Sequence, residues 1–331
     1  MSVSLLDPAI ALADLWQRDF PLDTHPFAIV GQAFGLSEAD AIDTLQGIHE
    51  AGILDRIGAA VRPNTVGAST LAAIAVPPER LDEIAEIVNA EPCVNHNYER
   101  ENEINLWFVV TADCRTAVTD VLTTIEKRTG LSVLYLPLER SYHIDLGFRL
   151  AGAKRDGMAK HVRETAFQVE PPDRRLLCAL EDGLPFTSRP YLEIANQLGW
   201  TEAQVLQRLE TLIENGIISR FGCILRHRKI GFKANAMAVW NVPDDKVDEI
   251  AENLSTFDAV TLCYRRTRRP PTWPYNLFAM IHGRARSDVM TEIAEAELAT
   301  GLAAYDGTVL FSKRCFKQRG ATFLTKASGA A

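Results

Sequence analysis

The chain has 331 residues, of which 47% are hydrophobic and 24% charged, which is typical of a globular protein large enough for several small domains. Its net charge of −8 works against non-specific binding to nucleic acid or to an anionic membrane. No apolar run approaches the roughly 20 residues that span a bilayer, and no basic segment precedes an apolar stretch at the start, so we expect a cytoplasmic protein.

The first predicted elements form a three-helix segment that ends in a strand. Apolar residues recur at helical spacing over about 8–17, 25–34 and 37–51, and Ser37 and Gly52 are suited to begin and end the third helix. Residues 53–57 follow as a short strand. Three helices followed by a strand are typical of a winged helix-turn-helix domain.

The next elements alternate between strand and helix. The pattern predicts a strand near 70–76, a helix near 78–89, strands near 93–99 and 104–111, a helix near 115–128 and a strand near 132–140. The order βαββαβ is that of a ferredoxin-like domain, whose sheet leaves one face partly free to bind a ligand.

The whole arrangement then occurs a second time. Residues 35–61 align with residues 199–225, and later segments keep nearly the same spacing; identical pairs are Gly35 and Gly199, Arg56 and Arg220, Gly58 and Gly222, Tyr98 and Tyr264, and Arg100 and Arg266. We therefore predict an α+β fold, a tandem repeat of winged helix-turn-helix and ferredoxin-like βαββαβ domains. The predicted domains are winged-helix-like at 1–62 and 170–228 and ferredoxin-like at 63–150 and 229–331, with a linker at 151–169.

The charge of the third helix argues against DNA binding. In a winged-helix domain this helix enters the major groove, where it needs cations to contact phosphates. Residues 37–50 carry four carboxylates and no Lys or Arg, and in the second copy the corresponding helix has more carboxylates than cations. We expect these segments to act as a scaffold that packs the two copies together, with neither DNA nor a membrane as a partner.

Three polar side chains recur at a spacing of two residues near the end of a predicted strand. His96, Tyr98 and Arg100 would project from one face of the sheet. A histidine, a phenol and a guanidinium together suit a polar anionic ligand. His143, at the end of the last predicted strand of the same sheet, is a candidate for the same pocket. From spacing alone, a surface histidine at a strand end is an equally open interpretation of either residue.

A second unusual segment combines arginines, prolines and aromatic residues. Four arginines fall within five residues, and prolines and two aromatic residues follow: Arg265, Arg266, Arg268, Arg269, Pro270, Pro271, Trp273, Pro274 and Tyr275. Arginine binds carboxylates in a bidentate manner, proline stiffens a loop, and the aromatic rings offer flat apolar surface. The segment suits a large flat ligand with several carboxylates; the alternative is a solvated basic loop that pairs with acidic neighbours.

The tandem of winged-helix and ferredoxin-like domains resembles the Lrp/AsnC family of regulators. Within it, HNYER followed by NLWF, the segment YHIDLGF and the segment CYRR…WPYNLF…IHG resemble the sirohaem decarboxylases. Those enzymes usually have two related subunits, and this chain is similar to both subunits fused into one. The resemblance covers nearly the whole chain.

The resemblance implies that the chain removes two acetate carboxyl groups of sirohaem as CO2, giving 12,18-didecarboxysirohaem for the haem of nitrite reductase. It implies no organic cofactor, because the iron belongs to the substrate, and the six cysteines form no C-x-x-C pair that would predict a metal site. His96 and His143 would be catalytic as proton donors, or one would be an axial ligand of the substrate's iron. The residues expected to bind the substrate are Tyr98, Arg100, Trp107, Arg140, Arg265, Arg266, Arg268, Arg269 and Trp273.

The two copies differ at the histidine positions. Leu262 matches His96, and the position that matches His143 falls among residues 313–315, Lys313, Arg314 and Cys315. We therefore expect one competent site per chain, built mainly on the first copy. Two other functions stay open, a tetrapyrrole-binding sensor or carrier without catalysis and an Lrp-type transcription regulator. A homodimer is an open alternative to a monomer.

Overall fold

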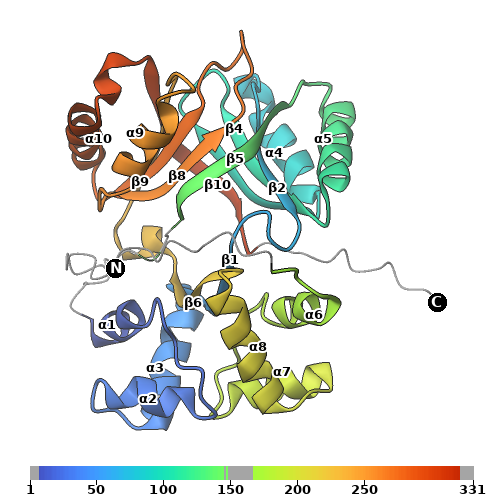
Figure 1. Ribbon diagram of the computed structural model, residues 1–331, viewed down its shortest axis with the longest axis vertical. Helices are drawn as coiled ribbons and strands as arrows, with labels where there is room; N and C mark the ends of the chain where they lie inside the picture. Colours follow the sequence, from blue (N-terminus) through green and yellow to red (C-terminus); the bar gives the residue numbers. More distant parts are fainter. Residues whose placement is uncertain (1–6, 145–146, 148–166, 321–331) are drawn as a thin grey trace. The chain divides into compact units, whose positions relative to one another are not determined.

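The structure is a computed structural model that describes residues 7–144, 147 and 167–320 (Figure 1). The chain divides into two compact units, and each unit combines segments from both copies of the repeat. We call residues 7–66, 147 and 167–231 the winged-helix unit, and residues 67–144 and 232–320 the barrel unit. Most of the predicted linker, residues 151–166, lies outside the described residues.

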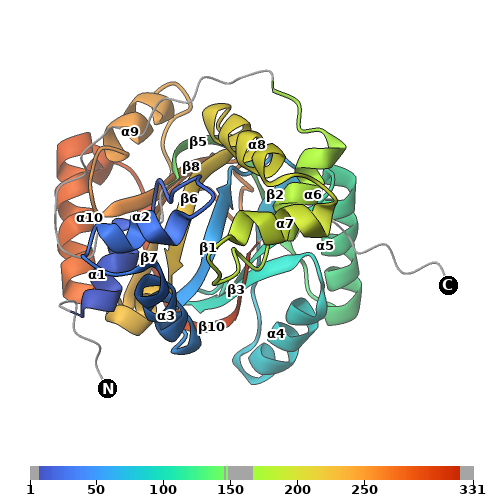
Figure 2. The ribbon, with the colours of Figure 1, turned by 90° about the horizontal axis from the view of Figure 1, so that it is seen from below.

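The winged-helix unit contains two sets of three helices and a strand, as the repeat predicts. The first copy contributes α1 (Pro8–Leu15), α2 (Pro26–Gln32), α3 (Glu38–Glu50) and β1 (Leu54–Val61), and the second contributes α6 (Pro171–Ala179), α7 (Pro190–Leu198), α8 (Glu202–Glu214) and β6 (Ile218–Leu225). The two strands pair antiparallel, with Gly58 opposite Gly222. The helices of the two copies lie on opposite sides of this β1–β6 ribbon (Figure 2).

The sequence explains where the third helix of each copy begins and ends. Ser37 accepts a hydrogen bond from the backbone N–H of Asp40 at 3.1 Å, and Asp40 accepts one from the N–H of Ser37, which satisfies two unpaired donors of the first turn. Gly52 then ends the helix with a φ of 69°, in the left-handed region that favours glycine. Among the described helices, none combines the length and the apolar character that crossing a membrane requires.

The barrel unit contains the two predicted βαββαβ segments. The first has β2 (Ala68–Ile74), α4 (Leu81–Ala90), β3 (Val94–Arg100), β4 (Leu106–Ala112), α5 (Arg115–Thr129) and β5 (Leu134–Ile144). The second has β7 (Ala234–Trp240), α9 (Val247–Leu254), β8 (Val260–Arg266), β9 (Leu277–Gly283), α10 (Arg286–Thr300) and β10 (Gly307–Gln318). The short 3-10 turns Pro78–Arg80, His227–Ile230 and Leu302–Ala304 complete the described elements.

The two segments close into a single barrel because the last strand of each copy serves both copies. The strand order is β10-β3-β4-β2-β5-β8-β9-β7. The first half of β5 pairs with β2 of its own copy, whereas the half from Leu138 to Ile144 pairs with β8 of the other copy. The strand β10 pairs in the same way with β7 and then with β3. The strand predicted at 132–140 is therefore extended to Ile144 by a partner from the second copy.

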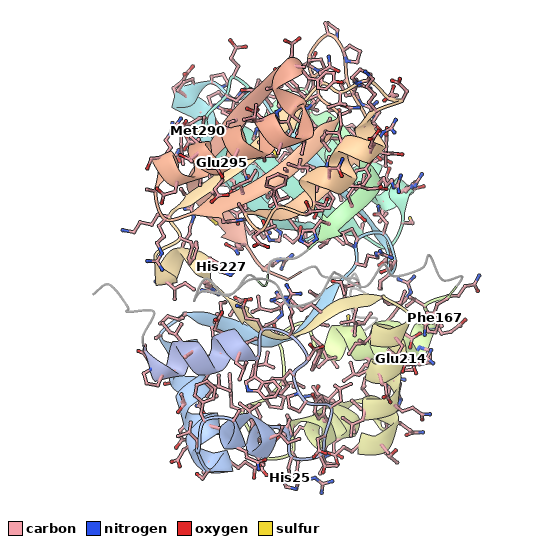
Figure 3. The ribbon with its side chains drawn as sticks, turned by 60° about the vertical axis from the view of Figure 1, so that its left-hand side comes forward. His25, Phe167, Glu214, His227, Met290 and Glu295 are labelled. Carbon is pink, nitrogen blue, oxygen red and sulfur yellow. The ribbon has the colours of Figure 1, made fainter. Side chains whose placement is uncertain are left out.

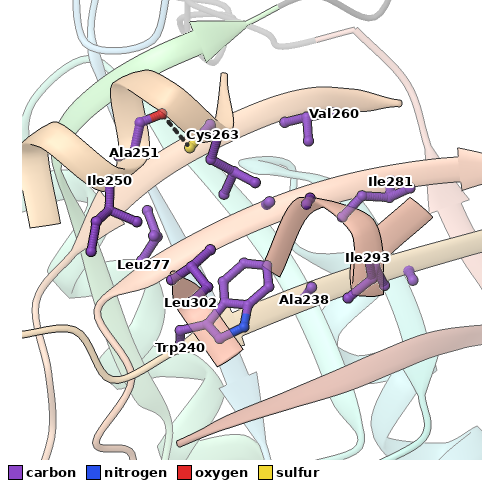
Figure 4. Packing of buried hydrophobic residues seen from close by; sticks show 14 of the residues in the cluster. Ala238, Trp240, Ile250, Ala251, Val260, Cys263, Leu277, Ile281, Ile293 and Leu302 are labelled. Atoms are coloured by element: carbon purple, nitrogen blue, oxygen red, sulfur yellow. Dashed lines mark hydrogen bonds between the residues drawn. The ribbon is translucent and has the colours of Figure 1, made fainter. Parts of the chain in front are cut away.

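Alternation along the strands divides the side chains between the helices and the barrel interior. Outward residues pack under α4 and α5 in one copy and under α9 and α10 in the other; in the second of these clusters, the Cys263 Sγ lies 3.7 Å from the Ala251 carbonyl (Figure 4). The alternate residues face inward and form a third cluster, whose buried members are Ala73, Ile104, Trp107, Leu136, Met237, Val239, Trp273, Phe278 and Leu310.

Candidate functional site

The inward face of β3 carries the three side chains that are predicted to share one sheet face. Asn97 points outward, and its Nδ2 donates to the Ala85 carbonyl of α4 at 3.3 Å. The rings of His96 and Tyr98 stack with their centroids 6.3 Å apart, and the Arg100 guanidinium lies 5.7 Å from the centroid of Tyr98. The predicted common face is confirmed, and it lines the barrel interior.

Two arginines occupy equivalent places inside the barrel. Arg100 on β3 is only 6% exposed, and its Nη1 donates to the Leu310 carbonyl of β10 at 3.1 Å. Arg266 on β8 donates from its Nη1 to the Leu136 carbonyl of β5 at 2.8 Å. Each guanidinium also lies against the tyrosine two residues earlier in its own strand. The interior thus repeats one arrangement, in which an arginine of one copy is tied to the last strand of the other copy.

Arg266 has no carboxylate partner among the described residues. Its guanidinium lies 5.2 Å from the ring centroid of Tyr264 and 5.9 Å from that of Phe278, and its Nε is buried with no hydrogen-bond partner in the described part of the chain. Burial lowers the pKa of Arg266 to about 10, because apolar surroundings disfavour the charged form. A buried cation is costly without a counter-ion, so this geometry suits the carboxylate of a ligand.

Two neighbouring arginines of the predicted cluster already pair with acids of the protein. Arg265 lies next to Arg266 on β8, so its side chain projects from the opposite face and contacts Glu139 at 3.0 Å and Asp244 at 2.9 Å. Arg268 shares Asp244 at 2.7 Å. The alternative of a basic segment that pairs with acidic neighbours therefore describes Arg265 and Arg268 correctly.

Two further arginines predicted to bind the substrate also contact the protein itself. Arg269 donates from its Nε to the Tyr135 carbonyl at 2.9 Å. Arg140 forms ion pairs with Asp248 at 2.8 Å and Glu252 at 3.0 Å, both on α9.

Strand alternation places Arg265 and Arg266 on opposite faces of β8, so these two side chains do not face one ligand together. Arg268 and Arg269 follow the strand and contact Asp244 and the Tyr135 carbonyl, and a role for them in substrate binding stays a prediction.

The two predicted tryptophans are core residues at the barrel interior. Trp107 and Trp273 are each 2% exposed, and their rings meet edge to face with centroids 5.0 Å apart. Trp107 donates from its Nε1 to the Ile104 carbonyl at 2.6 Å, whereas the Trp273 Nε1 is buried with no hydrogen-bond partner among the described residues. The rings therefore pack against each other and do not form an open aromatic wall on a loop.

His143 lies on the crossing half of β5, opposite Cys263, and is 7% exposed. A bulge interrupts β5 just before it, so strand alternation does not assign its side chain to the face that carries His96. Its counterpart on β10 is Lys317, which lies opposite Asn97. The match to residues 313–315 was wrong, although the second copy again has no histidine there. A pocket shared by His143 and His96 stays a prediction.

A series of hydrogen-bonded polar side chains inside the barrel includes His282, which is not among the residues predicted for the site. Arg100 lies with its Nη1 3.4 Å from the Oδ1 of Asn235 on β7, and the Asn235 Nδ2 lies 2.7 Å from the His282 Nε2 on β9. The His282 Nδ1 lies 3.0 Å from the Thr261 hydroxyl, which donates to the Met280 carbonyl at 3.0 Å. These contacts join Arg100 of the first copy to residues of the second.

The hydrogen bonds from Arg100 through Asn235 to His282 run in one direction, because an arginine guanidinium can only donate. Arg100 donates to Oδ1 of Asn235, which leaves the Nδ2 of Asn235 to donate to Nε2 of His282. Asn235 and His282 lie directly opposite each other on β7 and β9. Asn235 and His282 can be recognised as neighbours only once the pairing of β7 with β9 is known, because they are far apart in the sequence.

The part of the chain that the structure describes holds no group of three or more His, Cys, Asp or Glu side chains suited to a metal ion. The inward polar groups of the barrel are instead histidine, tyrosine, asparagine and arginine. Such a set can bind carboxylates and move a proton.

Comparison with protein families matches both parts of each copy. A model described as an AsnC-like ligand binding domain matches residues 66–143 and 229–317. A model described as the siroheme decarboxylase NirDL-like HTH domain matches residues 10–54 and 173–218. Together these models cover more than half of the chain.

Individual relatives agree with the family models. The siroheme decarboxylase NirDL subunit of Paracoccus denitrificans (strain Pd 1222) is 45% identical, over 96% of this chain and 97% of its own. The siroheme decarboxylase NirL subunit of Stutzerimonas stutzeri is 47% identical over 45% of this chain and 86% of its own. A crystal structure of siroheme decarboxylase NirDL in complex with an iron-uroporphyrin III analogue superposes with a TM-score of 0.69 at 28% identity, covering 97% of this chain and 94% of that one. The chain belongs to the siroheme decarboxylase family, in the NirDL form that joins two subunit-like copies in one polypeptide.

Proposed function

We propose that this protein is a sirohaem decarboxylase, which removes two acetate carboxyl groups as CO2 and forms 12,18-didecarboxysirohaem. The proposal is supported by membership of the siroheme decarboxylase family and by the anion-binding chemistry of the barrel interior. The iron of the tetrapyrrole is part of the substrate. No organic cofactor takes part in the proposed reaction.

The observation that carries the proposal is a difference between the equivalent strands β3 and β8 of the barrel. Both halves have an inward arginine tied to the crossing strand, at Arg100 and Arg266. Only the first half has a histidine on the same strand face, because His96 is replaced by Leu262 in the second. Two arginines that can bind carboxylates, together with His96 as a proton donor on β3, suit a polyanionic substrate that reacts at one site per chain.

The reaction needs a carboxylate to leave and a proton to arrive. The bond between an acetate methylene and its carboxyl carbon breaks, CO2 departs, and the electron pair stays on the methylene carbon. His96 gives that carbon a proton, which completes a methyl group, and water then restores the proton on His96. Arg100 and Arg266 hold carboxylates that remain, and the apolar interior favours loss of the scissile charge. His143 is the second candidate donor.

Incubation of the purified protein with sirohaem under anaerobic conditions tests the proposal. We expect a tetrapyrrole product that is lighter by two molecules of CO2, measured by mass spectrometry. Tight binding with unchanged mass would indicate a carrier or sensor instead. If sirohaem does not bind and DNA binds specifically, the protein is a regulator. That result would contradict the inference, drawn from the acidic first turn of α3, that the protein does not bind DNA.

Replacing His282 by leucine is expected to weaken the binding of iron uroporphyrin III by about tenfold. Leucine has no acceptor for the Asn235 amide, so that amide can turn its own N–H groups toward Arg100 and displace the guanidinium. The dissociation constant is measured by the change in the absorption of the porphyrin on titration.

Glutamine at position 282 is the matched control, because its side-chain carbonyl can accept near the place of Nε2. The variant His282→Gln should bind within about twofold of the unaltered protein. Equal weakening in both variants would show that His282 acts through packing alone.

A further inference from the structure

The two places where the copies join in the barrel have the same register. We call the pairing of β5 with β8 the first crossing and the pairing of β10 with β3 the second crossing (Figure 1). Arg140 lies opposite Arg265 in the first crossing, and Arg314 lies opposite Glu99 in the second. A bulge interrupts β5 and β10 at the residue before each of these pairs. The side chains of the two crossings can therefore be compared position by position.

One ion pair is the same at both crossings. Nη1 of Arg140 lies 2.8 Å from Oδ2 of Asp248 on α9, and Nη1 of Arg314 lies 2.7 Å from Oδ1 of Asp82 on α4. The two aspartates are equivalent in the repeat, since each begins a DEIAE segment. Because both crossings place an arginine on the strand and an aspartate on the helix, this pair does not depend on which copies are joined.

The ion pair next to it has opposite signs at the two crossings. In the first crossing, the acid is on the crossing strand, and Glu139 of β5 lies 3.0 Å from Nε of Arg265 on β8. In the second crossing, the base is on the crossing strand, and Nζ of Lys313 of β10 lies 2.7 Å from the Glu99 carboxylate on β3. We call these two contacts the sign-inverted pairs.

The burial of Glu99 gives the sign of its partner a large effect. The Glu99 side chain is 8% exposed, and it accepts a hydrogen bond from Nε of Arg314 at 2.6 Å in addition to its contact with Lys313. Burial favours a higher pKa for Glu99, but the hydrogen bonds from Lys313 and Arg314 hold that pKa below its ordinary value. A second carboxylate in the place of Lys313 would meet a charged, buried acid and would destabilise the pairing.

Pairing of like copies from two chains would bring like charges together. If the first copy joined the first copy of a second chain in the same register, Glu139 would face Glu99. If the second copy joined another second copy, Lys313 would face Arg265. Each of the sign-inverted pairs has opposite charges only when a first copy joins a second copy.

We propose that the sign-inverted pairs select the partner of each copy, so that the chain closes one barrel from its own two copies and rejects the same copy of a second chain. Such selectivity arises from repulsion in the wrong complex as well as from attraction in the right one. The aspartate pairs at the same crossings add stability without selectivity, because they are alike in both copies.

Selection of the partner also determines which side chains line the barrel. Pairing of unlike copies places His96 of the first copy and Arg266 of the second in one interior. A barrel made from two second copies would carry Leu262 at both positions equivalent to His96. This consequence for catalysis rests on the proposed function, whereas the selection of the partner does not.

Two double variants that keep the net charge of the chain test the proposal. Glu139→Lys with Lys313→Glu exchanges the signs of the two crossing strands, so like charges meet within a chain and opposite charges meet between like copies of two chains. Glu139→Lys with Arg265→Glu keeps opposite charges within the chain and also provides them between like copies. The control is Arg80→Glu with Glu83→Arg, which inverts an exposed 2.9 Å ion pair away from the crossings.

The measurement counts barrels that form between chains. Two preparations of each protein with different affinity tags are mixed in denaturant, refolded at high protein concentration, and purified on one tag. The share of the second tag that is retained gives the inter-chain fraction. The same mixture made from separately refolded preparations is subtracted, because it measures association through surfaces that are already folded.

We expect the exchange between the crossing strands to raise the inter-chain fraction by about tenfold or more over the unaltered protein. Glu139→Lys with Arg265→Glu should raise it by less, with a melting temperature within about 5 °C of the unaltered protein, because both ion pairs within the chain are kept. The control variant should not change it.

An inter-chain fraction that stays at the level of the unaltered protein in both crossing variants would overturn the proposal, as would an equal rise in the control. If the variant with exchanged crossing strands does not refold, Glu139→Lys with Arg265→Glu decides alone, because its charges within the chain remain opposite. The assay detects assembly and uses no tetrapyrrole, so its result is independent of whether the protein decarboxylates sirohaem.

Discussion

Replacing His96 by leucine is expected to lower the turnover of sirohaem by at least about 100-fold, while binding changes little. Leucine is the residue that the second copy carries at the equivalent position, Leu262, so the barrel already accommodates it on this strand face. The variant removes the proton donor and leaves both inward arginines in place. Single-turnover measurements of CO2 release, with the dissociation constant of iron uroporphyrin III, separate the chemical step from binding.

His25 offers a matched control for the loss of a histidine. It lies in the winged-helix unit, where its Nδ1 is 3.2 Å from the Glu38 carboxylate and 3.0 Å from the Ser188 hydroxyl (Figure 3). His25→Gln should leave turnover within about twofold of the unaltered protein. Near-full turnover in His96→Leu would transfer the role of proton donor to His143, for which His143→Ala is the corresponding variant.

The arrangement of the fold could be predicted from the repeat only up to the boundary of each copy. Helices, caps and the βαββαβ order follow from local spacing, as at Ser37 and Gly52. Closure of the barrel does not, because the half of β5 from Leu138 to Ile144 finds its partner in β8 of the other copy. Bulges on this half break the alternation that would mark a strand in the sequence.

The candidate site shows the same limit. The common face of His96, Tyr98 and Arg100 follows from a period of two and was predictable. The same period places Arg265 and Arg266 on opposite faces, but four arginines within five residues predict only a basic cluster and not which of its members faces the ligand. The acids that pair with Arg265 lie in other elements, including Glu139 on β5 of the first copy. These ion pairs join residues far apart in the sequence, so the local pattern around Arg265 could not predict them.

Arg266 and Arg265 give the sharpest comparison of a ligand-binding and a structural arginine. We expect Arg266→Gln to weaken the binding of iron uroporphyrin III by about 10- to 100-fold, because a charge-assisted contact to a carboxylate contributes about 1.5–3 kcal/mol. Arg265→Gln, one residue away on the outer face, should change binding by less than about twofold, since its partners are partly exposed carboxylates of the protein itself.

Stability should change in a way that a purely structural role for Arg266 would not produce. Arg266→Gln loses the contact with the Leu136 carbonyl but also removes a buried charge that has no carboxylate partner among the described residues. The free energy of unfolding without ligand should therefore fall by no more than about 1 kcal/mol, and chemical denaturation measures it. A large loss of stability with unchanged affinity would make Arg266 a structural residue. A loss of affinity with stability retained would mean that the barrel keeps this cation for the carboxylate of its ligand.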